Sequence, residues 1–489
     1  GSTSFRHFRI DNADQPDSKL NIVRSTYLDA QGMLWIGTEN GIVLWHTATD
    51  WSTRRRVDTP ASRVNHIYAD RHGVVWAATL SAGLLRWDAS TKKFKQFVKQ
   101  AIDPYSLPSD DVRAVLHDRG GMLWIATLTD GIAITNLNSK GFQRIIPFDA
   151  DAQNPRPNNA IGRIAGAADG QIWLANNNGV ALFDLSSSKV LKHYRAHKNQ
   201  RGSLSNYHVY SLHKQENGPL WIGTSVGLNR LDDNNGREAQ FTVIQFGSIA
   251  DDYINTIAAG DEGVLWLGTG NSLIRYEIKT GKHHKYLSDP ADPDSRSAKG
   301  TTTILQDSRR RLWAGAEWVG GGLDLLDQKT GKFTHFRHDA TDPTSISADN
   351  ISSLHEDAKG RIWVGASNGL NQIITSQDGR ISFRHFSDSR SIGPAKIVAI
   401  ESDLQGRLWL STVNGLICFE PDSGVVKRYT ASDGLSDSFS GASYRDKQGV
   451  LYFGGTKGIT SVYPTAVRSF STPPQLAITD ISVFNRSLK

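Results

Sequence analysis

The strongest constraint on the fold is an internal repeat of about 45 residues. A block of the form D-x-x-G-x-L-W-x-G-T recurs along the chain, and its aromatic position is held by Trp35, Trp76, Trp124, Trp173, Trp221, Trp266, Trp313, Trp363, Trp409 and Tyr452. Successive aromatics are separated by between 41 residues (Trp35 to Trp76) and 50 residues (Trp313 to Trp363). A period of this length is typical of architectures in which each unit buries its apolar faces against its neighbours.

Each repeat is predicted to form four short strands. In the second copy an apolar stretch at 64–69 leads into the turn Asp70-Arg71-His72-Gly73, and the strand 74–79 carries the tryptophan. Asp can bond its own backbone and Gly accepts a positive φ, so this turn suits a hairpin. Helical periodicity is missing throughout the sequence. The expected fold is therefore all-β, a β-propeller of about ten four-stranded blades.

The two ends of the repeat region suggest how the ring closes. The segment Phe5-Arg6-His7-Phe8 matches a fourth-strand pattern seen at 383–386, while the last copy reaches Pro464 without a fourth strand of its own. The expectation is that the N-terminal strand completes the last blade, which closes one ring of ten and removes two sheet edges. Two smaller rings, or an interrupted ring, are the alternatives.

Composition narrows the class of protein. The 55 basic and 49 acidic residues leave a net charge of +6 without a concentrated basic block, which argues against nucleic-acid binding. The single cysteine, Cys418, excludes an internal disulfide and a thiolate metal cluster. No apolar run approaches the ~20 residues that cross a bilayer. Residues 1–4 are interpreted as a leader that includes a tag-cleavage remnant, Gly1-Ser2.

The repeat resembles the two-component regulator propeller repeat. The resemblance is carried by L-W-I-G-T at 34–38 and 220–224, and by the connections D-P-Y-S-L at 103–107 and D-P-T-S-I at 342–346. It covers residues 5 to 464, and the segment P-P-Q-L-A-I-T-D-I at 473–481 looks like the family's junction with an immunoglobulin-like module. The expected organisation is a propeller over 5–466, followed at 467–489 by a linker and the start of that module.

The resemblance implies an extracytoplasmic sensor. In the family the module leads to a transmembrane helix and a cytoplasmic histidine kinase or diguanylate cyclase, and relatives with kinase output often sense oligosaccharides. The chain is thus expected to be the periplasmic region of an inner-membrane signalling protein, with a small polar ligand or glycan as its partner and a homodimer as a candidate assembly. A protein-interaction platform is the alternative from another class.

Catalysis, metals and cofactors find little support in the sequence. No Gly-x-Ser-x-Gly elbow, H-E-x-x-H helix or phosphate-binding loop is present. The Asp-x-x-Gly turns offer too few oxygens for Ca²⁺, so they are interpreted as hairpins. Adjacent carboxylates such as Asp110-Asp111 point apart on a strand, which disfavours the rival hypothesis of a glycoside hydrolase or polysaccharide lyase. No cofactor and no metal are expected, and the propeller itself is interpreted as non-catalytic.

A ligand is expected on the face that carries the longest loops and the entries to the innermost strands. The candidates there are Arg63, Arg113, Arg163, Tyr207, His208, Tyr253 and Lys396. The most irregular loop adds Glu317 and a tryptophan outside the repeat, Trp318. An aromatic side chain beside charged groups suits stacking on, and hydrogen bonding to, a sugar. The alternative for Trp318 is that it covers a neighbouring blade.

Overall fold

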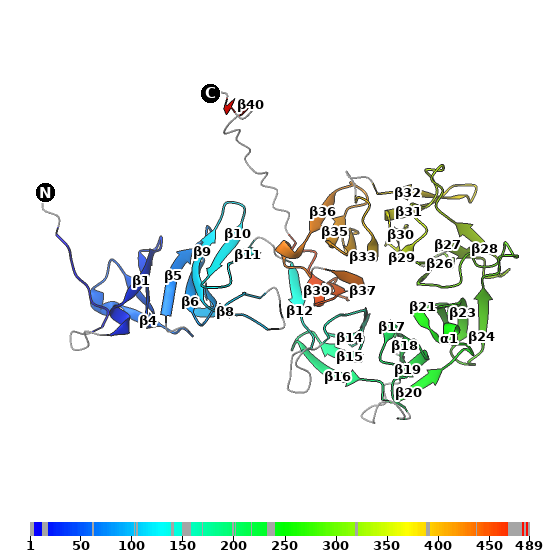
Figure 1. The fold of residues 1–489 in the computed structure, drawn as a ribbon, viewed down its shortest axis with the longest axis horizontal. Helices are drawn as coiled ribbons and strands as arrows, with labels where there is room; N and C mark the ends of the chain where they lie inside the picture. The colour runs from blue at the N-terminus through cyan, green and yellow to red at the C-terminus, as the bar shows by residue number, and fades with distance from the viewer. Residues whose placement is uncertain are drawn as a thin grey trace. The chain divides into compact units, whose positions relative to one another are not determined.

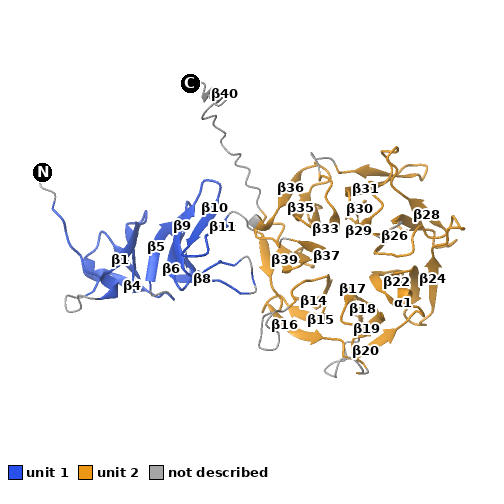
Figure 2. Cartoon of the chain, viewed as in Figure 1, with its two compact units in different colours: residues 1–140, 468–489 blue, residues 141–467 orange. Residues whose placement is uncertain are grey.

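The chain forms two compact units, residues 1–140 with 468–489 and residues 141–467 (Figure 2). The computed structural model describes residues 4–11, 18–60, 63–101, 103, 106–137, 141–148, 158–168, 170–197, 200, 202–216, 218–231, 240–317, 321–387, 392–436, 438–467, 482–483 and 486–487. Within these residues nearly all regular structure is antiparallel sheet, as the repeat predicts. No helix among them has the length and apolar character of a membrane span.

The first unit contains three blades in its described part. They consist of β1 (Val23–Leu28), β2 (Met33–Thr38), β3 (Gly41–His46) and β4 (Arg55–Val57); of β5 (Arg63–Ala69), β6 (Val75–Leu80), β7 (Leu84–Asp88) and β8 (Lys93–Phe97); and of β9 (Val112–His117), β10 (Met122–Thr127) and β11 (Ile132–Asn136). A short 3₁₀ turn, η1 (Lys19–Asn21), precedes the first blade, and a second, η2 (Trp51–Thr53), connects β3 to β4. The third sheet has three strands, in the order β11-β10-β9.

The second unit begins with three blades of regular order. They are β13 (Arg163–Gly166), β14 (Gln171–Asn176), β15 (Gly179–Asp184) and β16 (Lys189–Tyr194); β17 (Val209–Lys214), β18 (Leu220–Thr224), β19 (Gly227–Leu231) and β20 (Phe241–Ile244); and β21 (Ile254–Ala259), β22 (Val264–Thr269), β23 (Ser272–Glu277) and β24 (His283–Leu287). A single helical turn, α1 (Ile249–Asp252), precedes β21.

Four further blades complete the unit. They are β25 (Thr303–Gln306), β26 (Leu312–Ala316), β27 (Gly322–Leu326) and β28 (Phe333–Phe336); β29 (Ile351–Glu356), β30 (Ile362–Ala366), β31 (Gly369–Thr375) and β32 (Ile381–His385); β33 (Ile397–Ser402), β34 (Leu408–Thr412), β35 (Gly415–Phe419) and β36 (Val426–Tyr429); and β37 (Phe439–Arg445), β38 (Leu451–Gly455) and β39 (Gly458–Val462) with β12 (Phe142–Ile145). The 3₁₀ turn η3 (Ala431–Asp433) precedes β37.

These sheets stand around a common axis, with the first strand of each blade innermost (Figure 1). Each innermost strand contacts the next in chain order, and β37 contacts β13, so the described sheets of this unit form a closed ring of seven. Seven blades fall inside the usual range for propellers, four to eight, whereas the expected ten do not. The predicted blade architecture is confirmed, but the single ring of ten is wrong.

The strand that closes the ring is β12. It pairs with β39 in the register Phe142↔Val462 to Ile145↔Ile459, so the last blade has the order β12-β39-β38-β37. By position in the repeat, β12 is the fourth strand of the third copy, which explains why that blade keeps three strands. The segment Phe5–Phe8 was expected in this role. Its Phe8 instead packs on Trp45 and Trp51 of the first blade, at ring-centroid distances of 5.6 and 5.1 Å.

Apart from Trp124, the repeating aromatics are buried, as the repeat predicts. Trp76, for example, packs against Val112, Val115 and Leu123 of the following blade. In the ring the last aromatic, Tyr452, packs on Ile161 and its neighbours in the first ring blade, which completes the circle. A buried aromatic of this size contributes a few kcal/mol, so the ring is held by seven such contacts.

One carboxylate links each Asp turn to its tryptophan. In the turn at Asp357, Oδ1 accepts the amides of Lys359 and Arg361 at 2.9 and 3.1 Å, and Oδ2 accepts the indole N–H of Trp363 at 2.9 Å. The same aspartate-to-aromatic bond, 2.7 to 3.1 Å long, occurs at Asp29, Asp70, Asp118, Asp307, Asp403 and Asp446. These oxygens are committed to hydrogen bonds, which supports the hairpin interpretation over a calcium loop.

The turn that begins at Gln215 lacks this carboxylate. There the indole nitrogen of Trp221 is buried without a hydrogen-bond partner.

The predicted immunoglobulin-like module at 467–489 falls largely outside the described residues. Its described part is a short pair of strands, β40 (Ser482–Val483) and β41 (Arg486–Ser487). The leader at 1–4 is described only at Ser4. Both assignments stay predictions.

Candidate functional site

Several predicted site residues of the ring share one end of it. Innermost strands begin at this end and second strands finish there, because the two are antiparallel. Arg163 opens β13, whereas His208, Tyr253 and Lys396 immediately precede β17, β21 and β33. Glu317 immediately follows β26, so it lies at the same end. We call this region of residues 141–467 the axial end.

Glycine hairpins hold the segments that carry two of these residues. The amide of Gly179 in one blade donates to the carbonyl of Tyr207 ahead of the next blade, at 3.1 Å. The amide of Gly369 makes the same bond, also 3.1 Å, to Ala395 beside Lys396. Gly179 has φ +112°, and a Cβ there would lie 2.1 Å from the Tyr194 carbonyl, so a larger residue is excluded.

The helical turn α1 positions Tyr253. Its residue Asp251 is buried and accepts hydrogen bonds from Ser272 Oγ and Lys285 Nζ, both at 2.7 Å. The carbonyl of Tyr253 accepts from the amide of Gly270 at 3.1 Å. These bonds fix the backbone on both sides of the tyrosine.

Charged groups meet at the axial end across blades that are not adjacent. Lys396 Nζ forms an ion pair with Glu317, although the whole blade β29–β32 separates their own blades in the ring. Both side chains stay partly open to solvent, 40% and 32% exposed. Burial lowers the pKa of Arg163 from its usual value, and the negative charge of Glu317 opposes that shift. Arg163 belongs to the blade β13–β16, so charged residues from three different blades lie at the axial end.

Arg163 leaves most of its donors for other partners. Nη1 donates to the carbonyl of Gly162 at 2.7 Å. A Cβ at Gly441 would lie 3.4 Å from the same nitrogen, so the guanidinium rests against the backbone of β37.

Aromatic side chains form a second group at this end. The ring centroids of Tyr207 and His208 are 4.3 Å apart, those of His208 and Tyr210 are 6.3 Å apart, and those of Tyr210 and Tyr253 are 4.5 Å apart. Burial and a hydrogen bond with Tyr210 raise the pKa of Tyr253. Sequence reasoning missed Tyr210, although an aromatic two residues after His208 at a strand entry was a usable signal.

Three of the predicted residues are not part of this arrangement. Arg63 and Arg113 belong to the other compact unit. There Arg63 lies 3.4 Å from Glu39 and donates to Asn65 at 3.0 Å, and Arg113 is exposed. Trp318 lies outside the described residues. Binding by these three residues stays a prediction.

A further polar cluster, also missed, lies on the innermost strands β29, β33 and β37, where His355 and Glu401 pair with the repeat aromatics. Ser443 donates to Glu401 at 2.9 Å. Burial raises the pKa of Glu401 to about 7, against the charge of Arg445. Burial also lowers the pKa of His355 to about 4, and its Nε2 has no hydrogen-bond partner within the described structure.

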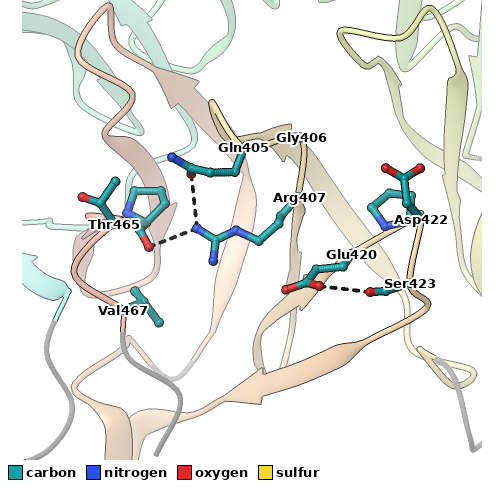
Figure 3. A pocket seen from close by; sticks show the side chains of 10 residues that line it. Gln405, Gly406, Arg407, Glu420, Asp422, Ser423, Thr465 and Val467 are labelled. Atoms are coloured by element: carbon teal, nitrogen blue, oxygen red, sulfur yellow. Dashed lines mark hydrogen bonds between the residues drawn. The ribbon is translucent and has the colours of Figure 1, made fainter.

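A cavity of about 600 Å³ lies among the turns near Pro464 (Figure 3). Its arginine, Arg407, is already engaged, since it bonds Asp403 at 2.7 Å, Gln405 at 3.3 Å and the Pro464 carbonyl at 3.0 Å. The lining acids are engaged too: Glu420 accepts from Ser423, and Asp422 pairs with a lysine and an arginine. These groups form a structural junction with few free contacts for a ligand. Elsewhere in the described residues, no three His, Cys, Asp or Glu side chains gather as a metal site.

Comparison with known families agrees with the repeat. Residues 18–40 and 345–368, one segment in each unit, match the model of the two component regulator propeller. These two segments are therefore similar to the two-component regulator propeller repeat. No curated protein matches the chain.

Solved structures share the propeller fold. The chain is similar to the extracellular domain of BT3049 from B. thetaiotaomicron, described as part of a hybrid two component system, with a TM-score of 0.61, 20% identity and 94% of this chain covered. It is similar to the extracellular domain of BT4673 from the same organism, with a TM-score of 0.54, 18% identity and 94% covered. The chain spans 64% and 59% of those two chains. It also resembles a streptogramin B lyase, with a TM-score of 0.50, 17% identity, 66% of this chain and 97% of the lyase covered.

Proposed function

We propose that this chain is a ligand-sensing propeller of an extracytoplasmic signalling protein, and that it binds a small polar ligand, a saccharide, at the axial end. The observation that carries the proposal is the Glu317–Lys396 ion pair, which spans a whole blade at the end of the ring where Arg163 also lies. Charged groups at an axis, with aromatic rings at the same end, are what a polar ligand with apolar faces requires. The two segments that match the regulator propeller model, and the similar fold of two extracellular domains, support the sensing role.

The test is calorimetric titration of the intact chain with a panel of neutral and acidic oligosaccharides. Lys396→Met and Tyr253→Ala should each weaken a genuine ligand by about tenfold or more, since each removes a direct contact. The matched control is Lys359→Met, an exposed lysine paired with Asp422 at the outer turns, and it should leave binding unchanged. Failure of every saccharide to bind, or equal loss in the control, would overturn the proposal.

The propeller is proposed to be non-catalytic, although the lyase shows that this fold also supports enzymes. At the axial end the carboxylate of Glu317 is neutralised by a lysine, which makes it a poor general base. Incubation of the chain with its best saccharide ligand should release neither new reducing ends nor unsaturated products. Turnover that is lost in Glu317→Gln would establish the enzyme instead.

A second function, a protein-interaction platform, is favoured by apolar side chains that project from loops at the axial end. They include Ile249, which is 89% exposed, Tyr207, which is 50% exposed, and the hairpin residues Val226 and Val413. A partner that binds this surface should lose affinity in Ile249→Ser but not in Lys396→Met. A saccharide should show the reverse pattern.

A further inference from the structure

The three axial charges do not balance, and this imbalance constrains the ligand. Arg163 and Lys396 contribute two positive charges, and Glu317 contributes one negative charge. Within this group Lys396 pairs with the single carboxylate. Among these described charges, that of Arg163 is left over for an incoming group.

Glu317 occupies the position that an anionic ligand would take. It is the first residue after β26, next to the loop that departs most from the repeat, so the ring geometry itself does not require a charge there. Its partner Lys396 reaches it across an intervening blade rather than within a sheet. Because both side chains are partly exposed, the pair can open without unfolding any strand.

We infer that the axial end selects a sugar that carries a carboxylate, and that this carboxylate displaces Glu317 from Lys396 and Arg163. The inference rests on the proposed function, because it names the ligand class of the same site. Displacement exchanges one carboxylate–lysine pair for another and leaves Glu317 in water, so the cost is small. The guanidinium offers further N–H donors beyond the one bound to Gly162, which suits a carboxylate with two acceptor oxygens.

The aromatic side chains at the axial end favour a ligand that also contains a sugar ring. The Tyr210–Tyr253 pair supplies flat apolar surface at the same end, which fits the C–H face of a pyranose ring. The class is therefore a sugar acid rather than a simple carboxylate or a neutral sugar.

The experiment compares trigalacturonate with the neutral maltotriose, and acetate serves as a carboxylate without a ring. In the intact wild-type chain, trigalacturonate should bind more tightly than maltotriose, and acetate should not bind measurably. Glu317→Gln should tighten trigalacturonate about threefold to tenfold, because it removes the internal competitor, and should leave maltotriose unchanged. Lys396→Met should weaken trigalacturonate by about tenfold or more and reduce the dependence of its affinity on salt.

A matched variant tests whether the change in affinity comes from the loss of Glu317 itself or from the loss of any one negative charge of the protein. Glu216→Gln removes one exposed carboxylate elsewhere in the ring and should change neither affinity. If maltotriose binds as well as trigalacturonate, and Glu317→Gln changes neither, the sugar-acid inference is overturned while the proposed saccharide function stands. If the wild type and Glu317→Gln bind no sugar at all, both fail. Weaker trigalacturonate binding in Glu317→Gln would show that Glu317 is a ligand contact and would also overturn the inference.

Discussion

The two units are built from the same repeat but end differently. In the ring, the tryptophans at 221, 313 and 409 are completely buried, whereas Trp124, in the last blade of the first unit, is 38% exposed. On the same blade, Leu116 and Ile132 are 57% and 65% exposed. The sequence around Trp124 is as apolar as that of the other copies, so the difference comes from the neighbour and not from the repeat. A blade's aromatic is buried only when another blade covers it.

The two units also differ in one strand. β12 follows the third blade in sequence, yet it completes the seventh blade of the ring through β39. Pairing with β39 gives the last ring blade its fourth strand, and the third blade is left with β11 as an edge. Closure of one unit is therefore linked to the incompleteness of the other.

The largest expected effect comes from truncating the two apolar side chains by which β12 packs against the ring. Phe142 packs 4.8 Å from Tyr429, and Ile145 is buried in the cluster around Tyr452. Phe142→Ala combined with Ile145→Ala should destabilise the ring by about 4–8 kcal/mol, given the cost of truncating buried residues. Hydrogen exchange resolved by segment should show faster exchange throughout 158–467 and unchanged exchange in 18–137.

The control for that experiment is Val425→Ala, an exposed apolar side chain in the same unit. It should change the unfolding free energy by less than about 0.5 kcal/mol. Loss of protection confined to β39, with the other blades intact, would mean that β12 is dispensable for closure.

A second test compares equivalent tryptophans in the two units. Trp313→Ala should cost about 3–5 kcal/mol, because it leaves a cavity between two blades. Trp124→Ala should cost about 1–2 kcal/mol, since part of that side chain already faces solvent. Urea denaturation followed by segment-resolved exchange measures both, and equal losses would contradict the view that neighbours supply the burial.

The units should also differ in their response to pH. The residues paired with the repeat aromatics are Tyr27, Tyr68 and Leu116 in the first unit, while the ring has His355 and Glu401 at this position. The pKa of Glu401 is about 7 in the folded ring, above its ordinary value, so its contribution is complete at pH 4.5 and is lost as pH rises through 7. Glu401→Gln should therefore stabilise the ring at pH 8 by on the order of 2 kcal/mol and change little at pH 4.5.

Urea midpoints at the two pH values measure this effect, with Glu216→Gln as an exposed control in the same unit. A stabilisation of equal size at both pH values would show that the side chain acts through packing rather than through its charge.

The smallest expected effect concerns the turn without aspartate. Gln215→Asp should supply the missing acceptor for Trp221 and stabilise the ring by about 1 kcal/mol. The gain is limited because Pro219 stands where the other turns offer a second amide. Asp357→Ala is the reciprocal change and should destabilise, since four donors lose their acceptor. No gain from Gln215→Asp at matched pH would contradict the role given to the carboxylate.

Much of the fold could be predicted from the repeat. Strand number, hairpin turns and burial of the aromatics follow from periodicity and turn chemistry, and they are found in both units. Ring size was missed because it depends on the wedge angle between packed blades, which no single repeat encodes. Closure was assigned to residues 5–8 rather than 142–145 because fourth strands share only a loose alternation of apolar and polar residues, and many segments satisfy it.

The candidate site was predicted in part. Residues at strand entries were expected to share one end, and Arg163, His208, Tyr253 and Lys396 do so. The pairing of Glu317 with Lys396 could not be foreseen, because it depends on the radius of a ring whose blade number was wrong. For the same reason Arg63 and Arg113 were grouped with residues of a different unit.

The pairing of β12 with β39 also means that the ring cannot close until nearly all of the chain has been synthesised. Gln143 and Ser461 are 318 positions apart, so at 5–20 residues per second the ribosome needs roughly 15 to 60 seconds to deliver the second after the first. During that interval β12 has no partner strand, and an unpaired strand promotes aggregation with other nascent chains. The yield of folded protein in the cell then depends on the delay between synthesis of the two strands, rather than on the stability of the finished ring.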